Sequence, residues 1–187
     1  MLYLEYSLEE QEFQEFVYYA NWLSPEQKDY RFNYYFFNSF SYIIFVLLFA
    51  FAERRDFKPL IFLPIFVVAG IFIFFYLKRR SKSYPYQVAQ QLISKEGGSE
   101  TILSRRELTL KETDISIKTN LSELKYSWSG IIKKIEHKNC FYLYVGPRDA
   151  IIIPKRIFNN KNDYEKFEEY LSRYLSLSAD LYKHSSL

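Results

Sequence analysis

Two hydrophobic segments without a charged residue lie close together in the first half of the chain, at residues 32–52 and 59–77. A helix rises about 1.5 Å per residue, so each segment, at about 20 residues, is long enough for the roughly 30 Å hydrocarbon core of a bilayer. A chain of 187 residues has room for one domain of ordinary size, which could hardly bury two neighbouring helices that are apolar on every face. We therefore expect a transmembrane helical hairpin over residues 32–77.

Charged residues around the two segments predict their topology. Residues 53–58, which separate the segments, are too few for anything but a tight turn, so the two helices should run antiparallel. More Lys and Arg flank the outer ends of the segments than occupy this turn, and positive charge marks the cytoplasmic side of a membrane protein. We expect a multi-pass protein of the cell inner membrane with both termini in the cytoplasm.

The first hydrophobic segment carries a polar stripe. Its members recur at helical spacing and are Tyr34, Asn38, Ser41 and Tyr42. On one face of a helix, such residues are better placed against protein than against lipid. We expect this helix-packing face to contact the second segment of the same chain or, alternatively, another molecule in a homo-oligomer or partner complex.

Residues 1–31 predict a short strand followed by an amphipathic helix. Phe13, Phe16 and Val17 recur at helical spacing, and the other face of this helix is acidic. Helices that lie on membranes usually present basic residues to the lipid, so an acidic face argues against that placement. Residues 78–187 have an excess of Lys and Arg. We therefore expect the acidic helix to pack against the basic C-terminal domain.

Residues 84–187 predict an α+β domain. Between about residues 101 and 153, short runs of alternating hydrophobic and polar residues are separated by turn residues, which is typical of antiparallel strands. Residues 160–177 then place their apolar side chains on one helical face. We expect a small antiparallel barrel or sandwich, closed by this C-terminal helix, with the outline of a pleckstrin-homology-like domain.

Three runs in this domain carry a resemblance to a known family: Trp128–Glu136, Phe141–Tyr144 and Ala150–Phe158. With these runs, the chain resembles the C-terminal domain of YcxB-like bacterial membrane proteins. The resemblance implies a short strand and acidic helix, then a two-helix membrane hairpin, then a domain similar to bacterial pleckstrin-homology-like domains. It implies a fold and a topology but no activity.

The sequence contains none of the common catalytic signatures. It has no Gly-rich phosphate loop, no Gly-x-Ser-x-Gly and no His-Glu-x-x-His. Cys140 follows His137 by three residues, but a turn without an evident third group is a poor setting for a nucleophile and its base. Basic residues are interspersed with acidic ones, which argues against a nucleic-acid interface. We expect no enzyme activity, no metal, no cofactor and no nucleic-acid partner.

Basic residues are the best candidates for contacts with a protein partner or with lipid headgroups. The four that follow the second hydrophobic segment are Lys78, Arg79, Arg80 and Lys82, and those of the C-terminal domain are Lys133, Lys134, Lys155 and Arg156. The plainer interpretation of the second group is scattered solubilising charge.

These observations predict a non-enzymatic, membrane-anchored binding protein. Its domain would engage a protein partner or anionic headgroups at the cytoplasmic face. The alternative is an immunity protein that protects the cell from a membrane-acting bacterial toxin, because a small protein with aromatic-rich helices is suited to occluding one.

Overall fold

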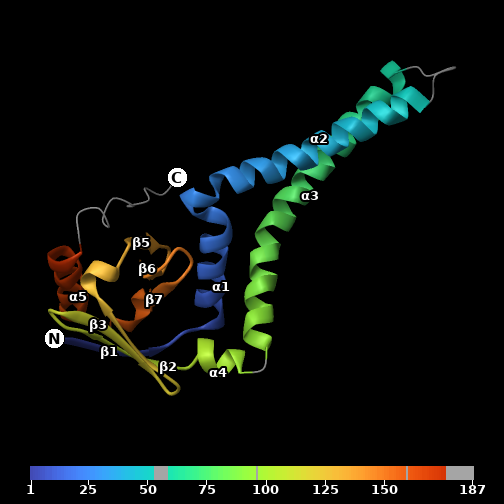
Figure 1. Ribbon diagram of the computed structural model, residues 1–187. Coiled ribbons are helices and arrows are strands. Elements are labelled where there is room, and N and C mark those ends of the chain that lie inside the picture. Colours follow the sequence, from blue (N-terminus) through green and yellow to red (C-terminus); the bar gives the residue numbers. More distant parts are fainter. Residues whose placement is uncertain (53–58, 96, 159, 176–187) are drawn as a thin grey trace. The chain divides into compact units, whose positions relative to one another are not determined.

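The computed structural model describes residues 1–52, 59–95, 97–158 and 160–175 (Figure 1). The chain divides into two compact units, which are described separately. The sheet unit consists of Met1–Phe16 and Ala89–Leu187, and the helical unit consists of Val17–Val88. The sheet unit is therefore assembled from both ends of the chain.

A four-stranded antiparallel sheet combines an N-terminal strand with three strands that follow residue 104. In spatial order its strands are β1 (Leu2–Ser7), β2 (Arg105–Leu110), β3 (Asp114–Thr119) and β4 (Glu123–Ser127). The pairing of β1 with β2 places Leu2 opposite Leu110 and Leu4 opposite Leu108. All four of these leucines are buried, so this long-range pairing builds part of the core.

Strand β1 owes its place to a period-two pattern. Leu2, Leu4 and Tyr6 are buried, while the residues between them are exposed. The side chains of a strand point alternately to its two faces, so this pattern buries one face of β1 and leaves the other in solvent. The hydroxyl of Tyr6 donates a hydrogen bond to the carbonyl oxygen of Ile152 at 2.8 Å, and so joins β1 to the second sheet.

The second sheet has three antiparallel strands. In spatial order they are β5 (Lys133–His137), β6 (Cys140–Tyr144) and β7 (Ala150–Pro154). Every residue of β6 is buried, which a strand with one solvent face cannot achieve. Two helices explain this burial: α1 (Glu10–Tyr18) and α5 (Lys161–Tyr174).

Aromatic rings identify the helix that covers each face of β6. Phe141 lies 5.3 Å from Phe167 of α5, measured between ring centroids. Tyr142 points to the other face, where its ring lies 5.2 Å from that of Phe16 in α1, at an edge-to-face angle. The sheet is thus enclosed between the C-terminal helix and a helix from the N-terminal segment.

Helix α5 also anchors the turn that leaves the first sheet. Asn160 caps the helix by accepting a hydrogen bond from the backbone N–H of Asp163 at 2.8 Å. Trp128 stacks on Tyr174 of α5 at 5.4 Å and donates its indole N–H to the carbonyl oxygen of Lys111 at 2.9 Å. In the described part of the chain, five short helical elements remain: η1 (Tyr19–Leu23), η2 (Pro25–Gln27), α4 (Gly98–Ile102), η3 (Trp128–Gly130) and η4 (Lys155–Ile157).

The helical unit contains α2 (Lys28–Ala52) and most of α3 (Pro59–Ser94), which lie side by side over part of their length (Figure 1). The Tyr42 hydroxyl donates to the carbonyl oxygen of Phe66 at 2.5 Å. A Cβ at Gly70 would lie 3.3 Å from the Tyr42 ring, so glycine permits this close approach. Helix α3 passes position 84, where the sequence predicts the start of the C-terminal domain, without interruption.

The structure corrects the prediction of a membrane hairpin. Within the described residues, no helix combines the length and the apolarity needed to cross a membrane. This finding contradicts the predicted spans at 32–52 and 59–77 and the multi-pass inner-membrane location, with both termini cytoplasmic, that was predicted from them. An uncharged segment of sufficient length, on which the prediction rests, is therefore not by itself evidence of a membrane span. The predicted turn at 53–58 lies outside the described residues.

The predicted fold class changes accordingly. The membrane hairpin, which was one part of the predicted fold class, is contradicted by the same finding. The structure supports helices together with two antiparallel sheets, one of four strands and one of three.

Truncation of Phe167 tests the packing of α5 on the second sheet. Phe167 is fully buried against Phe141, so we expect Phe167→Ala to lower the free energy of unfolding by about 3–5 kcal/mol, as large-to-small changes in a core do. Lys166→Ala, at an exposed neighbouring position, should change it by less than about 0.5 kcal/mol. Urea unfolding of the full chain, followed by circular dichroism, measures both. Equal effects of the two substitutions would contradict the packing described.

Candidate functional site

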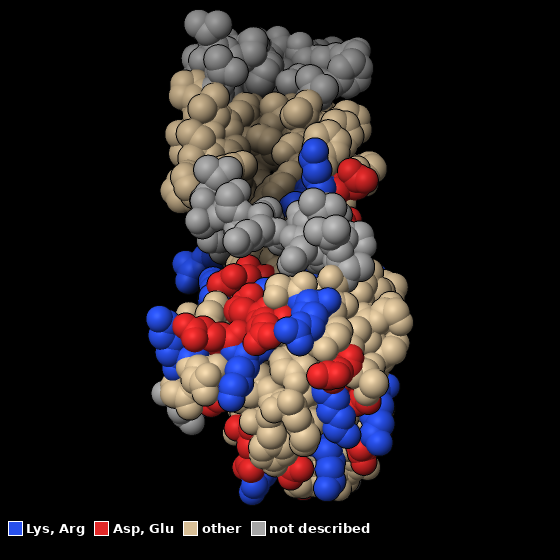
Figure 2. Space-filling model, turned by 90° about the vertical axis from the view of Figure 1, so that its left-hand side faces the viewer, with Lys and Arg blue, Asp and Glu red and all other residues tan. Residues whose placement is uncertain are grey.

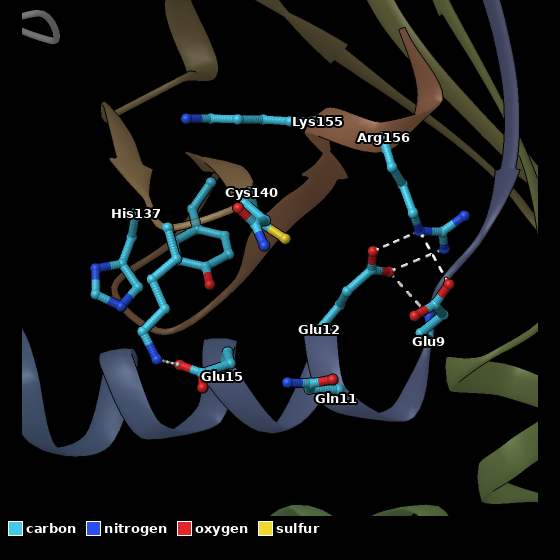
Figure 3. A pocket seen from close by; sticks show the side chains of 11 residues that line it. Glu9, Gln11, Glu12, Glu15, His137, Cys140, Lys155 and Arg156 are labelled. Atoms are coloured by element: carbon cyan, nitrogen blue, oxygen red, sulfur yellow. Dashed lines mark hydrogen bonds and ion pairs between the residues drawn. The ribbon is translucent and has the colours of Figure 1, made fainter. Parts of the chain in front are cut away.

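A pocket of about 510 Å³ lies between α1 and the end of the three-stranded sheet (Figure 3). All of its lining residues belong to the sheet unit. They are Glu9, Gln11, Glu12, Glu15, His137, Lys138, Asn139, Cys140, Tyr142, Lys155 and Arg156. The pocket therefore combines an acidic helix face with basic residues and the single cysteine of the chain.

A tight turn between β5 and β6 places two of these side chains together. His137 and Cys140 are directly opposite each other in the strand register, with only Lys138 and Asn139 between them. Lys138 adopts the left-handed conformation, at φ 47°, that two-residue hairpin turns require. The backbone N–H of Lys155 donates to the carbonyl oxygen of Asn139 at 2.7 Å, and so holds this turn against the end of β7.

Arg156 is the main electrostatic contact between α1 and the sheet. Its guanidinium donates to both carboxylate oxygens of Glu12, at 2.7 and 3.1 Å, and to the carbonyl oxygen of Ser7 at 2.7 Å. Glu9 lies 3.2 Å from the same group. The hydrogen bond with Glu12 is the main cause that raises the already high pKa of Arg156. We call this arrangement the Arg156 clamp.

A second ion pair holds the same helix further along. Glu15 lies one turn beyond Glu12 on α1, and its carboxylate accepts a hydrogen bond from the Lys138 ammonium at 2.7 Å. The predicted packing of the acidic N-terminal helix against basic residues of the C-terminal segment is confirmed by these two contacts. The side chains of Glu12 and Glu15 are only 11% and 16% exposed, so both carboxylates need these partners.

Cys140 is a poor nucleophile in this setting. Its side chain is buried, and burial, followed by the nearby charge of Glu12, raises the pKa of the thiol to about 12. Reactive cysteines instead have a lowered pKa, because the thiolate is the attacking species. Although His137 lies beside Cys140, the environment of the thiol opposes a Cys–His catalytic pair.

The pocket does not resemble a metal centre. In the described part of the chain, no group of three or more His, Cys, Asp or Glu side chains is arranged to hold a metal ion. The carboxylates of the pocket instead face cations of the chain itself, as Figure 3 shows for Glu12 and Arg156.

The four predicted contact residues of the C-terminal domain do not form one basic patch. The ammonium of Lys134 pairs with Glu168 of α5 at 2.9 Å, and that of Lys155 pairs with Glu136. Lys133 lies over the ring of Tyr144, with its ammonium 4.5 Å from the ring centroid. Figure 3 shows Lys155 extending away from the carboxylates of α1, whereas Arg156 points toward them. On the face that Figure 2 shows, basic and acidic side chains are intermixed over the sheet unit.

The other predicted residues belong to the helical unit. Lys78, Arg79 and Arg80 are exposed on α3, and the side chain of Lys82 lies outside the described part of the structure. The amide of Asn38 donates to the carbonyl oxygen of Tyr34, one turn earlier in α2.

The predicted helix-packing face divides between two roles. Tyr42 contacts α3, as the within-chain alternative requires, whereas Ser41 is exposed. Tyr34 packs edge-to-face on Trp22 at 5.4 Å.

The individual partners of the basic residues do not follow from the sequence pattern. Helical spacing predicts one acidic face on the N-terminal helix, whereas Glu12 and Glu15 make specific bonds with Arg156 and Lys138. Their three-residue spacing was a usable signal, because it places both carboxylates on one side of the helix.

A double-mutant cycle measures the strength of the Arg156 clamp. We expect Glu12→Gln and Arg156→Gln to be coupled by about 1–2 kcal/mol in the free energy of unfolding, because the pair is bidentate and Glu12 is largely buried. The matched control is the exposed pair of Glu5 and Arg105, for which we expect less than about 1 kcal/mol. Equal coupling in the two cycles would show that the clamp is an ordinary surface ion pair.

The pH dependence of stability tests the buried thiol. Because folding raises the pKa of Cys140 to about 12 from its ordinary value of 9.0, the native state resists ionisation of the thiol. The stabilisation is fully present below pH 9 and is lost as the pH rises toward 12. The free energy of unfolding of Cys140→Ala should therefore fall less than that of the unchanged chain between these pH values. Identical pH profiles for Cys140→Ala and the unchanged chain would mean that folding does not raise the pKa of the thiol.

Comparisons with known proteins identify a family match for part of the chain. No curated protein and no solved structure matches the chain. Residues 110–171 match the model of a protein family described as YcxB-like protein. The matched range begins at the end of β2 and ends within α5, so it includes the three-stranded sheet and the basic side of the pocket. The resemblance predicted from the sequence is thereby confirmed: over residues 110–171 the chain has the sequence pattern of the YcxB-like family.

Proposed function

We propose that this is a non-enzymatic binding protein that uses the exposed apolar surface of its helical unit to hold a protein partner. The observation that carries the proposal is the extent of that surface. Large apolar side chains that are at least 40% exposed follow one another along both helices. On α2 they are Tyr30, Phe32, Phe36, Phe37, Phe40, Ile43, Ile44, Phe45 and Leu48, and on α3 they are Val67, Val68, Ile71, Phe72, Phe74, Phe75, Tyr76 and Tyr84.

A surface of this kind requires a partner. Soluble monomers rarely expose contiguous apolar patches larger than a few hundred Å², and larger patches mark interaction sites. The hydrophobic effect contributes about 25 cal/mol for each Å² of apolar area removed from water, so covering these side chains provides a large driving force for binding.

Part of the surface is already ordered for binding. Phe32, Phe36 and Phe40 lie one helical turn apart on α2, and their rings stack at centroid distances of 5.9 Å and interplanar angles of 17° and 6°. Rings that are fixed by their neighbours lose little conformational entropy on binding. Aromatic side chains are also enriched among the residues that dominate protein–protein binding energies.

The basic residues of the sheet unit favour a protein partner over lipid headgroups. Lys134, Lys155 and Arg156 are each paired with a carboxylate of the chain, so an anionic headgroup would have to displace an existing ion pair. The high pKa of the Cys140 thiol supports the non-enzymatic part of the proposal. Immunity against a toxin stays an alternative prediction, in which the bound protein is the toxin.

Photo-crosslinking from the exposed aromatic positions tests the proposal. A benzophenone amino acid at Phe36 or Phe72, in the full chain and in the cells that produce it, should give one discrete protein adduct. Phe72 is 72% exposed and lies in the middle of the apolar surface. The matched control is Tyr3, which is 50% exposed but lies on β1 of the sheet unit. Mass spectrometry of the adduct identifies the partner.

Three results would contradict the proposal. One is the absence of any protein adduct at Phe36 and Phe72. Another is an adduct with lipid alone, which would assign the apolar surface to a bilayer. The third is the same adduct from Tyr3, which would show that capture does not depend on the helical unit.

A further inference from the structure

Strand β4 forms an open edge of the four-stranded sheet. It is the last strand in the order β1-β2-β3-β4, and no other strand of the described residues pairs with its outer side. Four of its five residues are exposed, and Leu124 is 49% exposed. An open edge presents unpaired backbone N–H and C=O groups and is a template for pairing with another strand.

The hydrogen-bond pattern shows which residues face this edge. The backbone N–H of Thr119 donates to the carbonyl oxygen of Ser122 at 2.8 Å, so these two residues form a hydrogen-bonded pair at the β3–β4 turn. Such pairs alternate along an antiparallel ladder, so the backbone groups of Leu124 and Tyr126 also point toward β3. The residues whose backbone groups face the open edge are therefore Glu123, Lys125 and Ser127.

The other edge of this sheet differs. The carbonyl oxygen of Ser7, at the end of β1, accepts a hydrogen bond from Arg156, and the side chains of β1 alternate between buried and exposed. The outer edge of β4 has no such contact with another strand of the described residues. One face of β4 carries an acidic and a basic side chain. Glu123 and Lys125 are two residues apart, so their side chains lie on the same face. The Lys125 ammonium lies 3.2 Å from a carboxylate oxygen of Glu123, and the two side chains are 63% and 50% exposed.

This charge pattern is self-complementary in only one antiparallel register. If two copies of β4 pair about a two-fold axis at Leu124, Glu123 of each copy lies opposite Lys125 of the other. An axis at Glu123 would oppose two glutamates, and an axis at Lys125 would oppose two lysines, both of which are unfavourable. The axis at Leu124 also makes the Glu123–Lys125 pairs the hydrogen-bonded ones, because their backbone groups already face the edge.

We propose that a second copy of this chain pairs with the outer edge of β4, antiparallel and centred on Leu124. The two four-stranded sheets then become one continuous sheet. The paired leucines cover each other at a non-hydrogen-bonded position, where opposite side chains approach most closely. The interface is distinct from the apolar surface of the helical unit, and it does not depend on the proposed function.

Disulfide trapping tests the register. We expect Leu124→Cys in the full chain to form an intermolecular disulfide under mild oxidation, in a detergent that masks the apolar surface of the helical unit. The one native cysteine, Cys140, is buried and does not compete. Lys118→Cys, exposed on the neighbouring strand β3, is the matched control and should remain reduced.

Charge reversal tests the complementarity. We expect E123K and K125E each to weaken dimerisation about tenfold or more, because each opposes like charges twice across the interface. A mixture of the two variants should form a mixed dimer, in which every facing pair is again of opposite sign. Glu112→Lys, in the exposed turn before β3, changes the net charge as E123K does and should leave the dimer intact. Analytical ultracentrifugation and native mass spectrometry measure these equilibria.

Each contrary result overturns the proposal. The proposal fails if the protein without substitutions is a monomer. It also fails if the protein forms a dimer that neither charge reversal weakens. Equal disulfide yields from Leu124→Cys and Lys118→Cys would exclude the register. A disulfide between Leu124→Cys and a different protein would show that β4 receives a foreign strand.

Discussion

Helix α1 packs on the face of the three-stranded sheet opposite to α5, and the rest of the sheet unit depends on this contact. Without α1, the rings of Tyr142 and Tyr144 on β6 would face water. Phe16 covers both rings, and the Arg156 clamp fixes the position of the helix that carries Phe16. Apolar contact provides most of the stabilisation, while the ion pairs define how the helix is oriented.

The same contact explains the chemistry of the pocket. Glu12 and Glu15 approach the sheet because the aromatic contact of Phe16 holds α1 there, and they meet the cations of Arg156 and Lys138. The pocket is therefore lined by charges that already satisfy one another. Cys140, buried beneath them near Glu12, keeps its proton. This arrangement is suited to holding a helix in place.

The sequence predicted the elements of the sheet unit better than it predicted their partners. Period-two alternation located β2, β3 and β7, and helical spacing located α5, because these patterns arise from local geometry. The partner of β1 was not predictable, because residues 2 and 110 are far apart and a strand pattern does not identify its neighbour. β6 was also predicted as an alternating strand, but its residues are buried on both faces, because a helix covers each of them. The hairpin prediction was wrong: it rested on the length of the uncharged segments alone, and within the described residues no helix is both long and apolar enough to cross a membrane.

The pairing of β1 with β2 has a consequence for synthesis of the chain. Leu2 meets Leu110, so a ribosome must add about 100 residues, at about 5–20 residues per second, before the partner strand exists. For several seconds the apolar side chains of Leu2, Leu4 and Tyr6 have no sheet to join. β1 is thus synthesised well before β2, the strand with which it pairs, and its apolar face has no partner strand during this interval.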